Sequence, residues 1–170
     1  MRRPSKRAAA ALALAALLAP HALRGASSVK KIALVTIPAT QQLKASAERV
    51  WSVLTSVDGF SALTGFKTTG DLRSFSAVGD NVAAEIWGDR GRLFVAEIVP
   101  GKELRVLFAP GGGHYFCDKR LVPSAWQGGT TLEYTDRYTD DKADAEKTAQ
   151  RAVEETQRGV QAFKKLVEQP

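Results

Sequence analysis

The sequence predicts an α+β domain in which a curved antiparallel β-sheet of about seven strands wraps around a long C-terminal helix. Three observations predict this fold class. A strand pattern from residue 32 is followed by an interrupted apolar helix, six short strand-like segments alternate with compact turns, and an amphipathic pattern fills residues 142–169. Because such short turns join neighbouring strands in antiparallel fashion, the six segments should form a meander.

The first 26 residues have the features of a secretory signal peptide. Four basic residues within the first seven positions precede an apolar stretch at residues 8–19, and small residues follow at Gly25 and Ala26. We therefore expect residues 1–26 to be cleaved and residues 29–170 to form the domain, which would be exported to the periplasm or secreted. An uncleaved anchor or an alanine-rich leader is the alternative.

The net charge of the chain belongs mostly to that leader. The sequence has 24 basic and 18 acidic residues, but five of the basic residues and none of the acidic ones precede Gly25. The remaining 19 basic and 18 acidic residues give a net charge of +1, which argues against nucleic acid as a partner. Cys117 is the only cysteine, so we expect no internal disulfide and a domain held together by its hydrophobic core.

The segment after the leader predicts a strand and then a broken helix. Residues 32–44 favour a strand, in which Pro38 is tolerated at an edge or a bulge. Ser46 is placed to cap the helix, which we expect to break at Asp58–Gly59. The apolar residues of this helical segment and of the stretch beyond the break are Val50, Trp51, Leu54, Phe60, Leu63 and Phe66.

Six further segments are each predicted to be a strand. They carry β-branched or aromatic residues in at least partial alternation, and glycine-containing turns separate them. The glycine run at 111–113 is predicted to be a hairpin turn, because no helix follows it to form a phosphate site. The predicted strands are residues 72–78, 81–88, 91–99, 103–109, 114–123 and 129–139.

The last predicted element is a helix over residues 142–169. Asp140–Asp141 offers an N-cap, and apolar residues at three-four spacing form one stripe. At 1.5 Å per residue this helix would be about 40 Å long, enough to lie across the sheet. Gly159 inside the helix indicates a close approach to another backbone, a bend over a cavity, or simple tolerance.

Two stretches resemble a known superfamily. The turn Lys44–Ala47, the Val50–Trp51 pair after it and the closing residues 156–169 are similar to those of the SRPBCC superfamily. This superfamily comprises the START-related, birch-pollen-allergen-like and polyketide cyclase/dehydrase and lipid transport proteins. The resemblance spans residues 35–168 and implies a helix-grip fold with a cavity between the sheet and the last helix. It specifies a fold better than an activity.

Our first functional hypothesis is a non-enzymatic binder or carrier of a hydrophobic small molecule, without a cofactor. The resemblance implies lipid, quinone, polyketide or isoprenoid-like ligands. Transient membrane contact for ligand exchange is a further expectation. Alternation and helical phase select residues to line the cavity, although the same residue types would equally close an ordinary core. They are Trp51, Phe60, Phe66, Phe75, Trp87, Phe94, Phe116, Tyr134, Tyr138, Val160 and Phe163.

Nucleophilic and metal chemistry find little support in the sequence. His114 is the one histidine after the leader, and Cys117 lies three residues away, so on a strand their side chains would point to opposite faces. A Cys–His nucleophile pair and a zinc site are therefore not expected. We expect Cys117 to be a buried, unreactive thiol.

The alternative function is a cyclase or dehydrase acting on a ligand in the same cavity. Its acid–base candidates are Asp136, Glu85, Tyr134 and His114. Asp136 shares a strand face with Tyr134 and Tyr138, so it lies inside the cavity if that face is the concave one. Because a lone buried carboxylate is costly, Asp136 could instead lie in water near the end of its strand.

Overall fold

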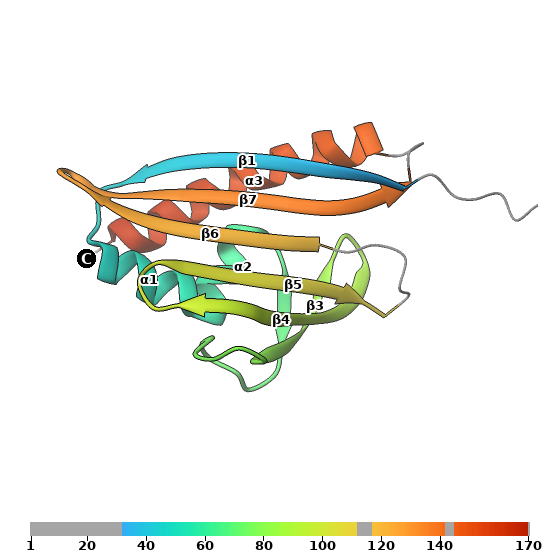
Figure 1. The fold of residues 1–170 in the computed structure, drawn as a ribbon, viewed down its shortest axis with the longest axis horizontal. Coiled ribbons are helices and arrows are strands. Elements are labelled where there is room, and N and C mark those ends of the chain that lie inside the picture. The colour runs from blue at the N-terminus through green and yellow to red at the C-terminus, as the bar shows by residue number, and fades with distance from the viewer. Residues whose placement is uncertain (1–31, 112–116, 142–144, 170) are drawn as a thin grey trace, which may run out of the picture. The chain divides into compact units, whose positions relative to one another are not determined.

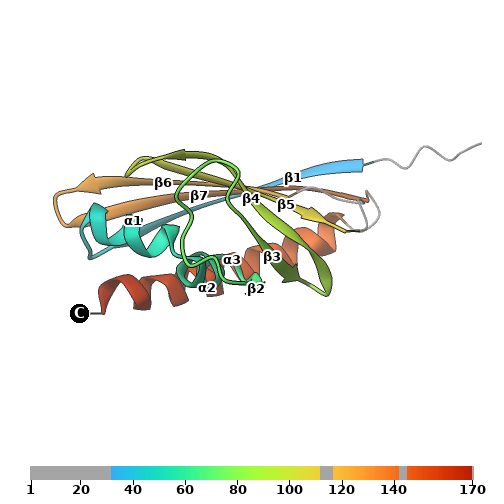
Figure 2. The same cartoon turned by 90° about the horizontal axis from the view of Figure 1, so that it is seen from below.

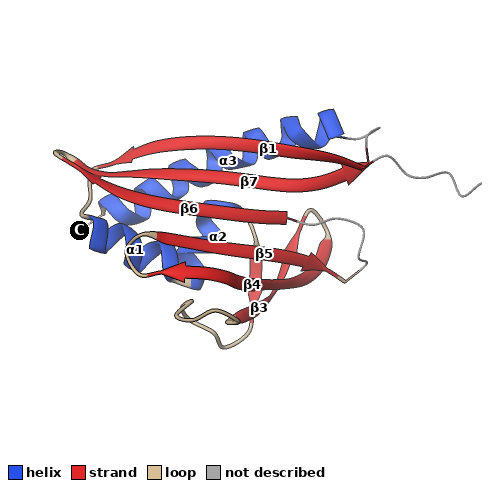
Figure 3. Cartoon of the chain, in the orientation of Figure 1, coloured by secondary structure: helices blue, strands red, loops and turns tan. Residues whose placement is uncertain are grey.

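The described part of the chain is a seven-stranded antiparallel sheet with helices packed on one face (Figures 1 and 2). The computed structural model describes residues 32–111, 117–141 and 145–169. The predicted signal peptide at residues 1–26 and the candidates His114 and Phe116 lie outside them. The fold class is confirmed, including the two short helices after the first strand and the long C-terminal helix (Figure 3).

The strand order confirms the predicted meander. The sheet runs β1-β7-β6-β5-β4-β3-β2, so consecutive strands pair from β2 to β7 and the first strand closes onto the last. The strands are β1 (Ile32–Leu43), β2 (Lys67–Thr69), β3 (Asn81–Ile86), β4 (Asp89–Val99), β5 (Glu103–Pro110), β6 (Cys117–Trp126) and β7 (Gly129–Asp141).

One predicted strand is wrong. Residues 72–78 form a loop, and the short strand β2 takes the edge position beside β3 instead. The backbone of the loop bonds to the junction of the first two helices, where Phe75 N donates to Thr55 O at 2.8 Å. Phe75 itself is buried and meets the ring of Phe60 edge-on at 5.4 Å. The apolar pattern of the loop thus reflects one anchoring aromatic residue.

The break between helices α1 (Ala47–Thr55) and α2 (Val57–Thr64) lies at Ser56, two residues before the predicted position. Ser56 Oγ accepts a hydrogen bond from Gly59 N at 3.0 Å and so caps α2. Gly59 lies within α2 for a steric reason, since a Cβ there would stand 2.0 Å from the carbonyl oxygen of Val53. The predicted cap of α1 by Ser46 is confirmed.

Helix α3 (Ala145–Glu168) packs across α2 and along β1 and β7, on the inner face of the sheet (Figure 2). Asp140–Asp141, the predicted cap, are instead the last residues of β7, since the strand continues two residues beyond its predicted end. Gly159 lies where α3 meets α2. A Cβ at this position would stand 1.9 Å from the carbonyl oxygen of Leu63, so the glycine permits a close approach of two backbones.

The core lies between α3 and the inner face of the sheet. Along β5 and β7 buried residues alternate with more exposed ones, whereas β6 begins with three consecutive buried residues. Helix α3 contributes a buried stripe that includes Thr156, Val160 and Phe163. This packing is apolar along most of its length. It changes character near Cys117 and Tyr138, where buried polar groups replace aliphatic ones.

Candidate ligand-binding site

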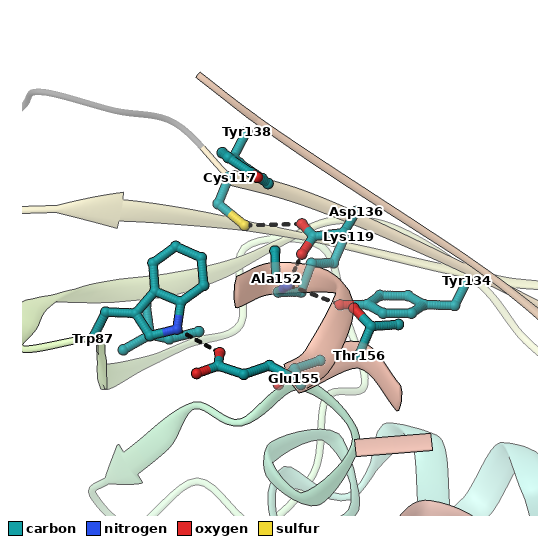
Figure 4. A pocket seen from close by; sticks show the side chains of 11 residues that line it. Trp87, Cys117, Lys119, Tyr134, Asp136, Tyr138, Ala152, Glu155 and Thr156 are labelled. Carbon is teal, nitrogen blue, oxygen red and sulfur yellow. Dashed lines mark hydrogen bonds and ion pairs between the residues drawn. The ribbon is translucent and has the colours of Figure 1, made fainter. Parts of the chain in front are cut away.

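A small cavity lies between the inner face of the sheet and α3 (Figure 4). It encloses about 20 Å³ of free space, which is room for about one water molecule. Its polar wall comes from β6, β7 and α3 and includes Cys117, Lys119, Tyr134, Asp136 and Thr156. Its apolar wall includes Ile86, Trp87, Tyr138 and Ala152.

The register of β6 and β7 creates the polar wall. Lys119 and Asp136 are direct partners in this ladder, and both point to the inner face. Lys119 Nζ lies 2.6 Å from Asp136 Oδ2 and donates to the Tyr134 hydroxyl at 2.8 Å. Cys117 Sγ lies 3.3 Å from the other oxygen of Asp136. The side chains of Lys119 and Asp136 are 4% and 7% exposed, so this ion pair is inside the protein.

Burial and mutual charge set the protonation of this cluster. Burial raises the pKa of Cys117 to about 12, against the opposing effect of Lys119. Burial likewise raises the pKa of Tyr134, again opposed by Lys119. Burial works against the ammonium form of Lys119, but the surrounding negative charge outweighs it and raises the pKa of Lys119. These raised pKa values keep Lys119 as an ammonium at neutral pH and leave the Tyr134 phenol and the Cys117 thiol uncharged.

One N–H donor of Lys119 has no hydrogen-bond acceptor among the described residues. An ammonium group carries three donors, and Asp136 and Tyr134 accept two of them. Among the described residues no third acceptor bonds to Nζ, although the ring of Phe66 lies 5.5 Å away. Since Lys119 borders the cavity, a ligand with an acceptor oxygen would complete the hydrogen bonding of the ammonium group.

The opposite wall of the cavity is closed by Trp87. Its indole Nε1 donates a hydrogen bond to Glu155 of α3, and the Arg151 guanidinium lies 5.0 Å from its ring centroid. The ring also meets Tyr138 edge-on at 6.3 Å. Figure 4 shows Trp87 reaching from its hairpin toward Glu155, so sheet and helix are tied together at this side.

The structure brings only some of the sequence-predicted residues to the cavity. Trp87, Tyr134 and Tyr138 line it. The acid–base candidate Asp136 lines it as well, so its side chain lies inside the protein and not in water at the end of its strand. Trp51 is half-buried on α1, away from the cavity lining. Buried in the core without lining the cavity are Phe60, Phe66, Phe75, Val160 and Phe163.

Two other candidates lie elsewhere. Phe94 is on the outer face of the sheet, because the inner positions of β4 are its buried neighbours Leu93 and Val95. Glu85 pairs with Arg90 at 3.0 Å on the β3–β4 hairpin, outside the cavity. Most of the predicted cavity residues are aromatic, and aromatic residues fill the core of this fold as well as the cavity wall, so the prediction included core residues.

The sequence reasoning missed Lys119, Glu155 and Thr156. Lys119 carried a usable signal, since it sits at an inward position of β6 between Cys117 and Leu121. A lysine in phase with apolar neighbours on a strand is a candidate for a buried charge. Its pairing with Asp136 required the strand register.

Metal and membrane features are not found in the described residues. No group of three or more His, Cys, Asp or Glu side chains among them is arranged to hold a metal ion. No helix in the described ranges is long and apolar enough to cross a membrane.

Comparison with known proteins shows the fold. The structure is similar to an uncharacterized protein from Rhizobium leguminosarum, with TM-score 0.61, 15% identity and coverage of 81% of this chain and 97% of that chain. Protein SA2116 of unknown function from Staphylococcus aureus gives TM-score 0.67 at 12% identity, over 81% and 96% of the two chains. No family model and no curated protein matches the sequence.

A third similar structure comes from a biosynthetic gene cluster. DynU16, a protein of the dynemicin biosynthetic locus, gives TM-score 0.51 at 16% identity, over 75% of this chain and 46% of that chain. At these identities the similarities establish the architecture alone, and that architecture is consistent with a helix-grip fold.

Proposed function

We propose that this protein binds a small organic molecule between the sheet and α3, as a carrier without enzymatic activity. The observation that carries the proposal is the buried Lys119–Asp136 pair, which opens onto a cavity and leaves one Lys119 N–H without a protein acceptor among the described residues. Apolar side chains at this position would often stabilise the fold as well as a buried ion pair does, so stability alone does not account for the pair.

The chemistry of the cavity defines the class of ligand. The wall formed by Ile86, Trp87 and Tyr138 suits an apolar or aromatic body. Lys119 and the Tyr134 hydroxyl suit a neutral oxygen, such as a ketone, quinone or hydroxyl group, because Asp136 already balances the charge of Lys119. Lipids, quinones and polyketides with such an oxygen fit this description.

The carrier is favoured over the cyclase or dehydrase by the state of the polar groups. Asp136, the candidate base, is engaged by Lys119 and Cys117, and the raised pKa values of Tyr134 and Cys117 keep both groups protonated at neutral pH. Such a cluster is suited to holding an oxygen rather than to removing a proton. With the proposed signal peptide, binding would take place in the periplasm or outside the cell.

Native mass spectrometry of the mature protein, purified from the compartment to which it is exported, tests this function. We expect a bound organic molecule of defined mass on the wild type, and its loss in the double variant Lys119→Met/Asp136→Leu. The control is Arg120→Gln, which changes a charge on the outer face of the same strand. A ligand-free wild type, or a ligand retained equally by the double variant, would refute the proposal.

A further inference from the structure

A second pocket adjoins the cavity on the far side of Trp87. It holds about 310 Å³ and is lined by Lys67, Glu85 and Arg151 together with three residues that also line the inner cavity: Ile86, Trp87 and Glu155. The inner cavity alone is too small for an organic ligand, whereas the outer pocket already lies at the lower end of the size range of ordinary ligand sites. Trp87 is the largest of the three side chains that border both spaces.

The backbone at Trp87 has a conformation that tryptophan rarely adopts. Trp87 and Gly88 form the two-residue turn between β3 and β4, with φ angles of 55° and 91°. Both values belong to the type I′ turn, whose first central position favours asparagine or glycine. Trp87 is the one non-glycine residue with a positive φ among those described. A tryptophan here points to a role for the side chain itself.

The lining of the outer pocket carries two basic and two acidic side chains, which differ in how they are paired. Its two carboxylates are already paired, Glu85 with Arg90 at 3.0 Å and Glu155 with Arg151 at 3.5 Å. Lys67 lies opposite Glu85 in the sheet but forms no ion pair among the described residues. The side chain of Lys67 is exposed, so it can meet a ligand without desolvating a buried charge.

We propose that Trp87, held by Glu155, is a movable partition between the two spaces, and that the outer pocket is a second subsite for an anionic group of the ligand. This rests on the proposed function. The ligand is then an elongated molecule with a neutral oxygen at Lys119, an apolar middle in the place of the indole, and a carboxylate-like group near Lys67. The positions of the Trp87 and Glu155 side chains then determine which molecules enter the inner cavity.

Stopped-flow fluorescence with N-phenyl-1-naphthylamine, a neutral aromatic probe, tests the partition. Trp87→Asn removes the indole and supplies the residue that the type I′ turn favours, so the variant should fold. We expect the association rate of the probe with this variant to rise about tenfold or more, because the hydrogen bond from the indole to the Glu155 carboxylate no longer holds the closed form. The association rate of Glu155→Gln should rise less than that of Trp87→Asn. Glu154→Gln, a solvent-exposed neighbour on α3, is the matched control and should leave the rate unchanged.

The sulfonated analogue, 1-anilinonaphthalene-8-sulfonate, tests the anionic subsite. Lys67→Met should weaken its binding about fivefold and leave the neutral probe unaffected, since one cation is lost from a partly exposed site. Equal effects on both probes would overturn the subsite. Equal rates in the wild type, Trp87→Asn and Glu155→Gln would overturn the partition alone. If neither probe binds even to Trp87→Asn, the proposed function fails together with it.

Discussion

Two ionic clusters on the same strand, one residue apart, differ in what surrounds them. On the inner face Lys119 pairs with Asp136 under α3, away from water. On the outer face Asp118 accepts a two-pronged hydrogen bond from Arg105, both at 2.9 Å, and another from Arg137 at 2.7 Å. The Asp118 carboxylate is 3% exposed, but its two arginines are 36% and 40% exposed and keep contact with solvent.

This difference separates a cluster that secures the sheet from one that forms a site. The outer arginines link β5, β6 and β7 and stay partly hydrated, so in this cluster only the Asp118 carboxylate is desolvated, whereas the inner pair buries both charges. The inner pair has given up its hydration and borders a cavity, where an apolar pair would serve stability equally well. This difference supports the proposed ligand-binding role of the inner pair.

The largest expected effect is on the inner pair. Lys119→Met leaves the Asp136 carboxylate buried without a cation, and we expect the free energy of unfolding to fall by about 3–5 kcal/mol. Lys119→Met/Asp136→Leu replaces both partners and should lie within about 1–2 kcal/mol of the wild type. Urea denaturation measures both. A double variant as unstable as the single one would contradict this account of the pair.

As the pH rises, the inner cluster should lose its contribution to the stability of the fold at a lower pH than the outer cluster does. The pKa of Cys117 is about 12 in the folded protein and about 8.5 in an unfolded chain, so the unfolded state loses its proton first. Stability is therefore fully present below about pH 8.5 and declines as the pH rises toward 12, by up to about 1.4 kcal/mol per pH unit for one proton. Tyr134 and Lys119, whose pKa values are also raised, steepen the decline at higher pH.

Thermal unfolding from pH 7 to pH 11 measures this decline. Cys117→Ala should remove its earliest part, between about pH 8.5 and 10, because that part belongs to the thiol. In the folded wild type the thiol should also resist a disulfide-exchange reagent at pH 8 and react on unfolding. Rapid labelling of the folded protein would show that Cys117 is accessible, against its 6% exposure.

Removing the outer carboxylate should have an intermediate effect. Asp118→Asn loses charge-assisted hydrogen bonds to Arg105 and Arg137, but both guanidinium groups remain hydrated. We expect a loss of about 1–2 kcal/mol in urea denaturation, less than for Lys119→Met. A loss equal to that of the inner variant would remove the distinction between the two faces.

The smallest effect is expected at the rim of the outer face. Arg120 bonds Glu103 at 2.6 and 2.8 Å, but its side chain is 44% exposed. Arg120→Gln should change the free energy of unfolding by less than about 1 kcal/mol, and high salt should reduce the difference further. A change above 2 kcal/mol would show that outer-face ion pairs are stronger than their exposure implies.

Local patterns determined much of the fold. Alternation placed six of the seven strands, Ser46 marked the start of α1, and three-four spacing gave the long helix with its apolar stripe. These features follow from interactions between near neighbours along the chain, which is why a single sequence reveals them. The loop at 72–78 was misassigned because one buried aromatic residue, Phe75, imitates the pattern of a short strand.

Only the tertiary structure decided which buried residues form the site. Alternation put Asp136 on the same face as Tyr134 and Tyr138, but that face could be assigned to the interior only after β7 paired with β6 and brought Lys119 opposite Asp136. The meeting of Trp87 with Glu155 joins residues 68 positions apart. The sequence therefore determined the elements and their faces, and the packing of α3 on the sheet decided the cavity, because a cavity depends on contacts between segments distant in the chain.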